Sequence, residues 1–175
     1  MEPKTELEMY RMLLIMHLKG FIYELRQMPS DKWDWTPDQA APSARIVAVH
    51  TWQWPMCDRQ HIEEPDAAKH TPVLEPPDDT EAFCAAFEVE TEKWNQMLRN
   101  MPPEQLDRPG LQFNIGEAKM NVRGFIGHII QNTIYKHGQF STLFFALGLD
   151  GTEPYTAPFP NPIYEEQLGV KGIDV

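Results

Sequence analysis

Length, composition and charge limit the class of protein before any motif is considered. The chain has 175 residues, of which 42% are apolar and 23% charged, as expected of one folded domain with a substantial core. Its net charge of −11 and pI near 4.9 argue against nucleic acid or an anionic membrane as a partner, because phosphate binding requires clustered Lys and Arg. No apolar run approaches the roughly 20 residues that span a bilayer.

The N-terminus and the cysteines indicate a cytoplasmic protein. The first residues carry no basic segment ahead of their apolar section, so no signal peptide is predicted. Two cysteines, Cys57 and Cys84, provide no disulfide framework. We therefore expect a reducing cytoplasmic location, with Cys84 as a small core residue.

Hydrophobic periodicity predicts two helices in the first third of the chain. The first spans Leu7–Met28. The second begins after the N-cap Ser43 and is expected to be kinked or ended by Pro55. The stretch Met56–Asp78 is rich in proline and polar residues, and it predicts a loop with one further helical turn near residues 59–62.

Two further helices are predicted in the second half. The third begins after the N-cap Asp79 and ends at Pro102. The fourth follows the N-cap Asn121 and ends with Gly148 as its C-terminal cap. Between these two helices the chain is expected to be irregular.

Four amphipathic helices without a convincing strand predict an all-α, antiparallel four-helix bundle over residues 1–150. The long connection between the second and third helices permits a crossover, which leaves the helix order open. Residues 151–175 form a tail rich in proline and aromatic residues, expected to pack on the bundle or on a partner subunit, with a disordered tail as the alternative. A methionine-rich face at Met9, Met12 and Met16 suits either gap filling or a dimer contact.

The fourth predicted helix carries the most informative departure from its own pattern. Asn132 and Lys136 fall in the middle of its apolar face, where an unsatisfied polar group costs roughly 1–3 kcal/mol and a charge costs more. We therefore expect this helix to mark the functional site. The apolar positions that define the face are Phe125, Ile129, Phe140, Leu143 and Leu147.

Two segments carry a resemblance to a known family. The serine-capped segment Ser43–His50, preceded by Trp33–Asp34–Trp35, and the run Val122–His128, followed by Ile134–Tyr135 and Gly138–Gln139, resemble the second and last helices of the DinB/YfiT-like superfamily. The resemblance implies a bacterial four-helix bundle, commonly dimeric. It also implies a divalent metal held by three histidines, one from the second helix and two, spaced four apart, from the fourth. Such proteins include metal-dependent enzymes that use low-molecular-weight thiols.

The implied ligand set is degenerate in this chain. The second-helix ligand falls on His50, the only position that matches, whereas the other two fall on Asn132 and Lys136. His128 lies one turn earlier, and His137 lies nine residues further on, about 180° around the helix, so both cannot reach one ion with His50. We therefore predict a pocket of His50, His128, Asn132 and Lys136 without a cofactor. Zinc or nickel on His50, His128 and the Asn132 carbonyl is the alternative.

Lys136 itself allows two interpretations. Its amine replaces the charge of the lost metal and pairs with a carboxylate, for which Glu88 and Asp58 are candidates. Alternatively, Lys136 extends along the helix to solvent.

Three functional hypotheses follow. In the leading one, the protein is a non-catalytic or small-ligand-binding member of the DinB-like bundles that has lost its metal site. The alternative is a metal-dependent thiol transferase or hydrolase-like enzyme that uses His50 and an improvised site. The third is a structural dimer with a water-filled pocket. The sequence does not decide whether the protein is an enzyme.

Overall fold

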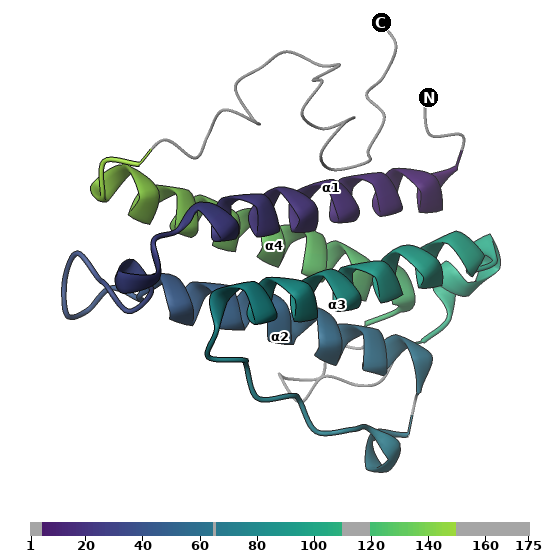
Figure 1. The fold of residues 1–175 in the computed structure, drawn as a ribbon. Coiled ribbons are helices and arrows are strands. Elements are labelled where there is room, and N and C mark those ends of the chain that lie inside the picture. The colour runs from purple at the N-terminus through teal and green to yellow at the C-terminus, as the bar shows by residue number, and fades with distance from the viewer. Residues whose placement is uncertain (1–4, 65, 110–119, 150–175) are drawn as a thin grey trace, which may run out of the picture.

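Four long helices make up the computed structural model, which describes residues 5–64, 66–109 and 120–149 (Figure 1). No strand forms in these ranges, so the predicted all-α four-helix bundle is confirmed. The predicted tail, residues 151–175, lies outside the described residues, as does most of the irregular connection before the last helix. The helices are α1 Glu6–Gln27, α2 Ala44–Glu63, α3 Thr80–Asn100 and α4 Val122–Ala146, with short 3-10 helices at Ser30–Lys32, Ala67–Lys69 and Pro103–Asp107.

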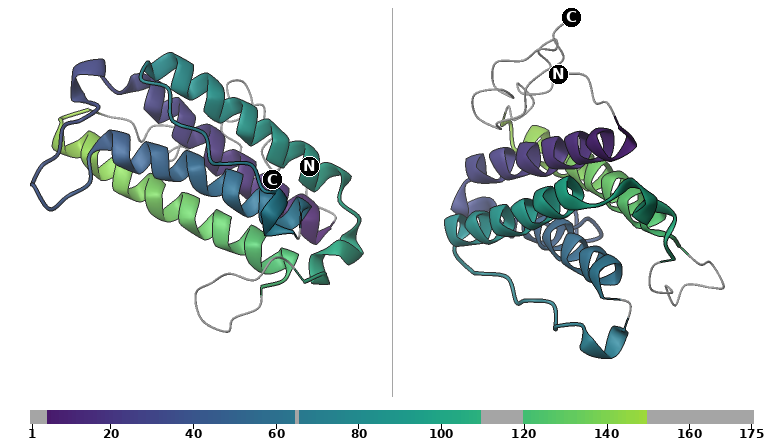
Figure 2. Two further views of the ribbon diagram at one scale, coloured as in Figure 1. Left: turned by 90° about the horizontal axis from the view of Figure 1, so that it is seen from below. Right: turned by 90° about the vertical axis from the view of Figure 1, so that its right-hand side faces the viewer.

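The bundle consists of two antiparallel pairs, α1 with α3 and α2 with α4. Helices from different pairs run parallel where α1 meets α4. Glu6 of α1 contacts Arg123 of α4, and Glu24, further along α1, contacts Ser141, further along α4. The connection between α2 and α3 crosses the length of the bundle to make this possible (Figure 2). The helix order that the sequence left open is therefore settled by this crossover.

Side-chain caps begin all four helices. The predicted N-caps Ser43, Asp79 and Asn121 each accept a hydrogen bond from a backbone N–H three residues on, as Thr5 does for α1. At the end of α4, Gly148 has φ of 72°, the left-handed conformation that favours glycine. The local signals that predicted these boundaries are thus confirmed.

Replacing Asp79 with alanine is expected to lower the free energy of unfolding by about 1 kcal/mol. The Asp79 carboxylate accepts the Ala82 N–H at 2.8 Å, and alanine leaves that donor to water. Asp78→Ala, next to it and exposed, is the matched control. Urea unfolding measures both, and an equal effect of the two substitutions would contradict the capping role.

Of the two outcomes predicted at Pro55, a kink or a helix end, the helix end is wrong. The helix continues eight residues further, to Glu63, with Pro55 inside it. The proline ring is buried, and the Pro55 carbonyl accepts a hydrogen bond from the Trp94 indole of α3 at 3.0 Å. Tertiary packing therefore offsets the roughly 3 kcal/mol that proline costs in a helix interior.

Aromatic and aliphatic side chains fill the space between the four helices. Cys84 is 0% exposed, which confirms it as a core residue. None of the described helices is both long and apolar enough to cross a membrane. The largest fully buried side chains are Trp52, Trp94, Phe21, Phe87, Phe125, Phe140 and Phe144.

Candidate functional site

Three residues of α2 present polar or aromatic groups along one helix face. His50, Trp54 and Asp58 follow one another at intervals of four, about one helical turn. The Trp54 indole N–H donates to His50 Nδ1 at 3.3 Å, which leaves the proton of a neutral His50 ring on Nε2. Asp58 is 0% exposed. The row thus runs from a half-buried imidazole to a fully buried carboxylate.

A second row, on α4, faces the first. His128, Asn132 and Lys136 are also spaced by four, and all three are half-buried. His128 Nδ1 lies 2.7 Å from Asp58 Oδ2, and the His128 ring packs edge-on to Trp54 at 5.5 Å between centroids. Because the helices are antiparallel, Lys136 comes opposite His50 at the other end. We call these six residues the α2–α4 seam.

The pKa of the histidine is lowered at one end of the seam and raised at the other. Burial, reinforced by the charges of Lys136 and His128, lowers the pKa of His50. Hydrogen bonding to Asp58 raises the pKa of His128, while burial raises that of Asp58. The seam therefore places a neutral imidazole beside an ammonium at one end and an imidazole bonded to a buried carboxylate at the other.

The predicted carboxylate partners of Lys136 are wrong. Asp58 pairs with His128, and Glu88 pairs with Arg26. The Lys136 amine instead donates to Gln139 Oε1 at 3.1 Å and lies 5.4 Å from the centre of the Tyr135 ring. Partial burial lowers the pKa of Lys136.

The fully buried stripe of α4 also differs from the prediction. Thr133 and His137, not Asn132 and Lys136, occupy its centre, where they are 1% and 6% exposed. Asn132 and Thr133 differ by about 100° around the helix, as do Lys136 and His137. Either the first or the second residue of each pair fits the three- and four-residue spacing of the apolar positions. His137 contacts Glu24 and Phe21 of α1, so the face that carries His137 is the one turned toward α1.

A buried polar cluster between α1 and α4 was missed from the sequence. Glu24 is 0% exposed, its Oε2 lies 3.1 Å from His137 Nε2, and the Ser141 hydroxyl is 3.1 Å from the same oxygen. Phe21 packs edge-on against the His137 ring. Burial, together with the charge of the nearby His137, lowers the pKa of His17. A lone glutamate in an amphipathic helix gives no signal of burial, so only the polar residues of α4 could have indicated this cluster.

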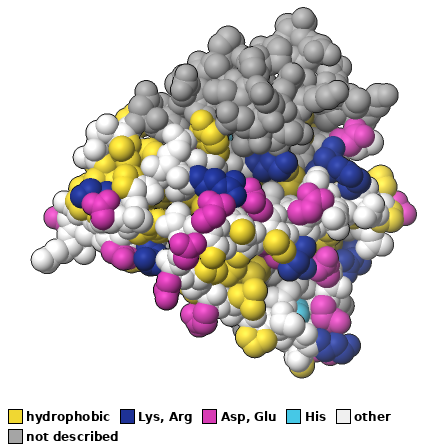
Figure 3. Space-filling model, in the orientation of Figure 1, with side chains coloured by type: hydrophobic (Ala, Val, Ile, Leu, Met, Phe, Trp, Pro, Cys, Tyr) yellow, Lys and Arg dark blue, Asp and Glu magenta, His cyan; other side chains and the backbone are white. Residues whose placement is uncertain are grey.

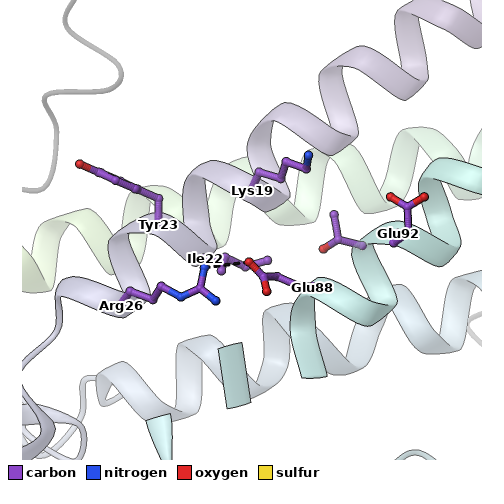
Figure 4. Close-up of a pocket in the computed structure, with 7 residues that line it drawn as sticks. Lys19, Ile22, Tyr23, Arg26, Glu88 and Glu92 are labelled. Atoms are coloured by element: carbon purple, nitrogen blue, oxygen red, sulfur yellow. Dashed lines mark hydrogen bonds and ion pairs between the residues drawn. The ribbon is translucent and has the colours of Figure 1, made fainter. Parts of the chain in front are cut away.

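A surface cavity of about 300 Å³ lies between α1 and α3, away from the seam (Figure 4). Two of the charged residues that line it are already paired, since Arg26 contacts Glu88 at 2.7 Å, and Arg26 also contacts Glu81 at 3.0 Å. Tyr23 extends away from α3 (Figure 4). Over this side of the molecule, acidic and basic side chains alternate without one sign dominating (Figure 3). Its volume favours this cavity, whereas the seam brings four ionisable groups with a shifted pKa close together: His50, Asp58, His128 and Lys136.

The side chains of the seam disfavour binding of a divalent metal. Lys136 brings a positive charge next to His50, and the Nδ1 of His50 already accepts the Trp54 N–H. Asn132 offers only an amide, a poor zinc ligand. Within the described ranges, no group of three or more His, Cys, Asp or Glu residues is arranged to hold an ion.

Comparisons with known proteins show the family of the sequence and the same fold in two solved structures. The sequence model of the DinB superfamily matches residues 13–140. YjoA, a DinB-like protein of Bacillus subtilis, superposes with a TM-score of 0.67 at 16% identity, over 86% of this chain and 96% of YjoA. YfiT of Bacillus subtilis, described as a probable metal-dependent hydrolase with an unusual four-helix bundle topology, gives 0.64 at 11% identity, over 86% and 92%. No curated protein matches the chain.

Proposed function

Because this chain belongs to the DinB superfamily, we propose that it binds a small anionic ligand at the α2–α4 seam, the place where the family resemblance puts a metal ion. The observation that supports this is the Lys136 amine, which is close enough to lower the pKa of His50. An ammonium next to His50, which matches a metal-ligand position implied by the family resemblance, repels a cation and attracts an anion.

The two residues supply complementary donors. With Nδ1 accepting from Trp54, neutral His50 carries its proton on Nε2 and can donate it. Lys136 adds an ammonium from the opposite helix. Donors of this kind suit a carboxylate or a phosphate group, and hydrogen bonds to charged groups are the stronger ones.

The Lys136→Met variant is expected to weaken binding of glutarate or inorganic phosphate by about 10- to 100-fold, since a hydrogen bond to a charged group contributes about 1.5–3 kcal/mol. Isothermal titration calorimetry of the untagged full chain measures this. Lys69→Met, in the exposed 3-10 helix Ala67–Lys69, is the matched control. Equal affinities of Lys136→Met and the parent chain would refute the proposed site.

The alternative function is a metal-dependent thiol transferase or hydrolase-like enzyme that uses His50. It is separated from the proposal by metal analysis of protein purified without a histidine tag. About one equivalent of zinc or nickel, lost in His50→Ala, would support the enzyme and contradict the anion site. Binding of neither metal nor anion would leave a structural dimer as the function.

We also propose that the protein is a cytoplasmic homodimer. The free cysteines Cys57 and Cys84 suit a reducing compartment. Exposed apolar side chains on α1 and α4, among them Met9, Ile134 and Phe145, offer surface for a second subunit. Sedimentation analysis of the full chain tests the oligomeric state.

A further inference from the structure

The Asp58 carboxylate is the least compensated charge of the seam. It is 0% exposed, and its Oδ1 has no hydrogen-bond partner among the described residues. Its Oδ2 contacts His128 Nδ1 at 2.7 Å. A buried carboxylate with one partner is unfavourable for folding. Its place behind a half-exposed imidazole is the arrangement that orients a histidine for proton transfer.

His128 has the geometry of a general base. Its Nδ1–H donates to Asp58, so the lone pair of the neutral ring is on Nε2. The side chain is 35% exposed, which allows a small molecule to approach. Edge-on packing against Trp54 restrains the ring.

The same face of α4 supplies two further groups at regular intervals. Asn132 lies one turn from His128, about 6 Å along the helix axis, and Lys136 lies two turns away, about 12 Å. An amide N–H can donate to a carbonyl oxygen, and an ammonium can bind a carboxylate. The order along the helix is therefore base, carbonyl donor and anion-binding group.

We propose that the seam hydrolyses small esters that carry a carboxylate several bonds from the ester group. His128 Nε2 takes a proton from water as the water oxygen adds to the ester carbonyl carbon, with Asn132 donating to the carbonyl oxygen. The bond between the carbonyl carbon and the alcohol oxygen then breaks, and His128 returns the proton to the leaving alkoxide. The products are a carboxylic acid and an alcohol. This inference rests on the proposed anion site at Lys136 and His50.

Mono-4-nitrophenyl glutarate is the anionic probe, and 4-nitrophenyl acetate is the neutral one. With untagged full chain in EDTA, we expect release of 4-nitrophenol above the buffer rate, with a higher kcat/KM for the glutarate ester. His128→Gln is expected to lower kcat/KM by about 100-fold or more. Lys136→Met is expected to raise KM for the glutarate ester only. His70→Gln, in the α2–α3 crossover with its ring against the Glu64 carbonyl, should match the parent chain.

The positioning role of Asp58 is tested by the pH profile. The base form of His128 is active, so the rate rises with pH through the His128 pKa, which Asp58 raises. Asp58→Asn should therefore lower kcat and move this rise to lower pH. A purely structural role would lower the rate without moving the profile.

Folding defects are controlled with the Asp58→Asn, His128→Gln double variant, which leaves no unpaired buried charge. It should retain the helical circular dichroism of the parent chain and lack turnover. Turnover that is absent in the parent chain, that survives in either His128 variant, or that requires added zinc would overturn the inference. Glutarate binding without turnover would refute this inference alone, whereas loss of glutarate binding would refute the proposed function.

Discussion

Replacing Glu24 with alanine is expected to lower the free energy of unfolding by about 3–5 kcal/mol. Glu24 is 0% exposed and lies 3.1 Å from His137 and from the Ser141 hydroxyl. Alanine removes the carboxylate, leaves the buried His137 and the partly buried Ser141 without it, and opens a cavity between α1 and α4. Urea unfolding followed by circular dichroism gives the value.

The control for Glu24 is an exposed glutamate in a surface ion pair. Glu88 contacts Arg26 at 2.7 Å with half of its side chain exposed, so Glu88→Ala should cost at most about 1 kcal/mol. In the double variant Glu24→Leu, His137→Leu the loss should be smaller than the sum of the single losses, because no buried group is left unpaired. Equal losses for Glu24→Ala and Glu88→Ala would contradict a structural role of the buried cluster.

Helix boundaries were predictable where a local rule governs them. Ser43, Asp79 and Asn121 cap their helices through their own side chains, and Gly148 adopts the conformation that ends α4. Pro55 shows the limit of such rules. The cost of a proline is local, but the Trp94 hydrogen bond that helps to offset it comes from a residue 39 positions away.

The candidate site was predictable in composition but not in detail. The resemblance placed His50, His128, Asn132 and Lys136 in one pocket, which stays a prediction. The structure brings His50 near His128 and Lys136. Asp58 pairs with His128 and not with Lys136. Pairing between two helices depends on their register, which the sequence pattern did not define. The same limit explains why Glu24 was missed: its partners lie 113 and 117 residues further on.

Acid is expected to destabilise the protein through His17. Burial, together with the charge of His137, lowers the pKa of His17 from 6.5 to about 4. The unfolded chain therefore binds this proton more tightly than the folded chain. The contribution is fully present above pH 6.5 and is lost as the pH falls to about 4. The loss amounts to at most roughly 3 kcal/mol.

The variant His17→Leu isolates the contribution of His17 to the pH dependence of stability. Glu24 and His137 face the same region from α1 and α4, and both residues are present in both proteins. The difference between the two stability curves therefore reports His17 alone. Urea unfolding at intervals from pH 7.5 to 4.5 should show the parent chain losing stability more steeply than His17→Leu. Because leucine cannot bind a proton in either state, parallel curves would mean that His17 titrates alike in the folded and unfolded chain, and its burial would then carry no electrostatic cost.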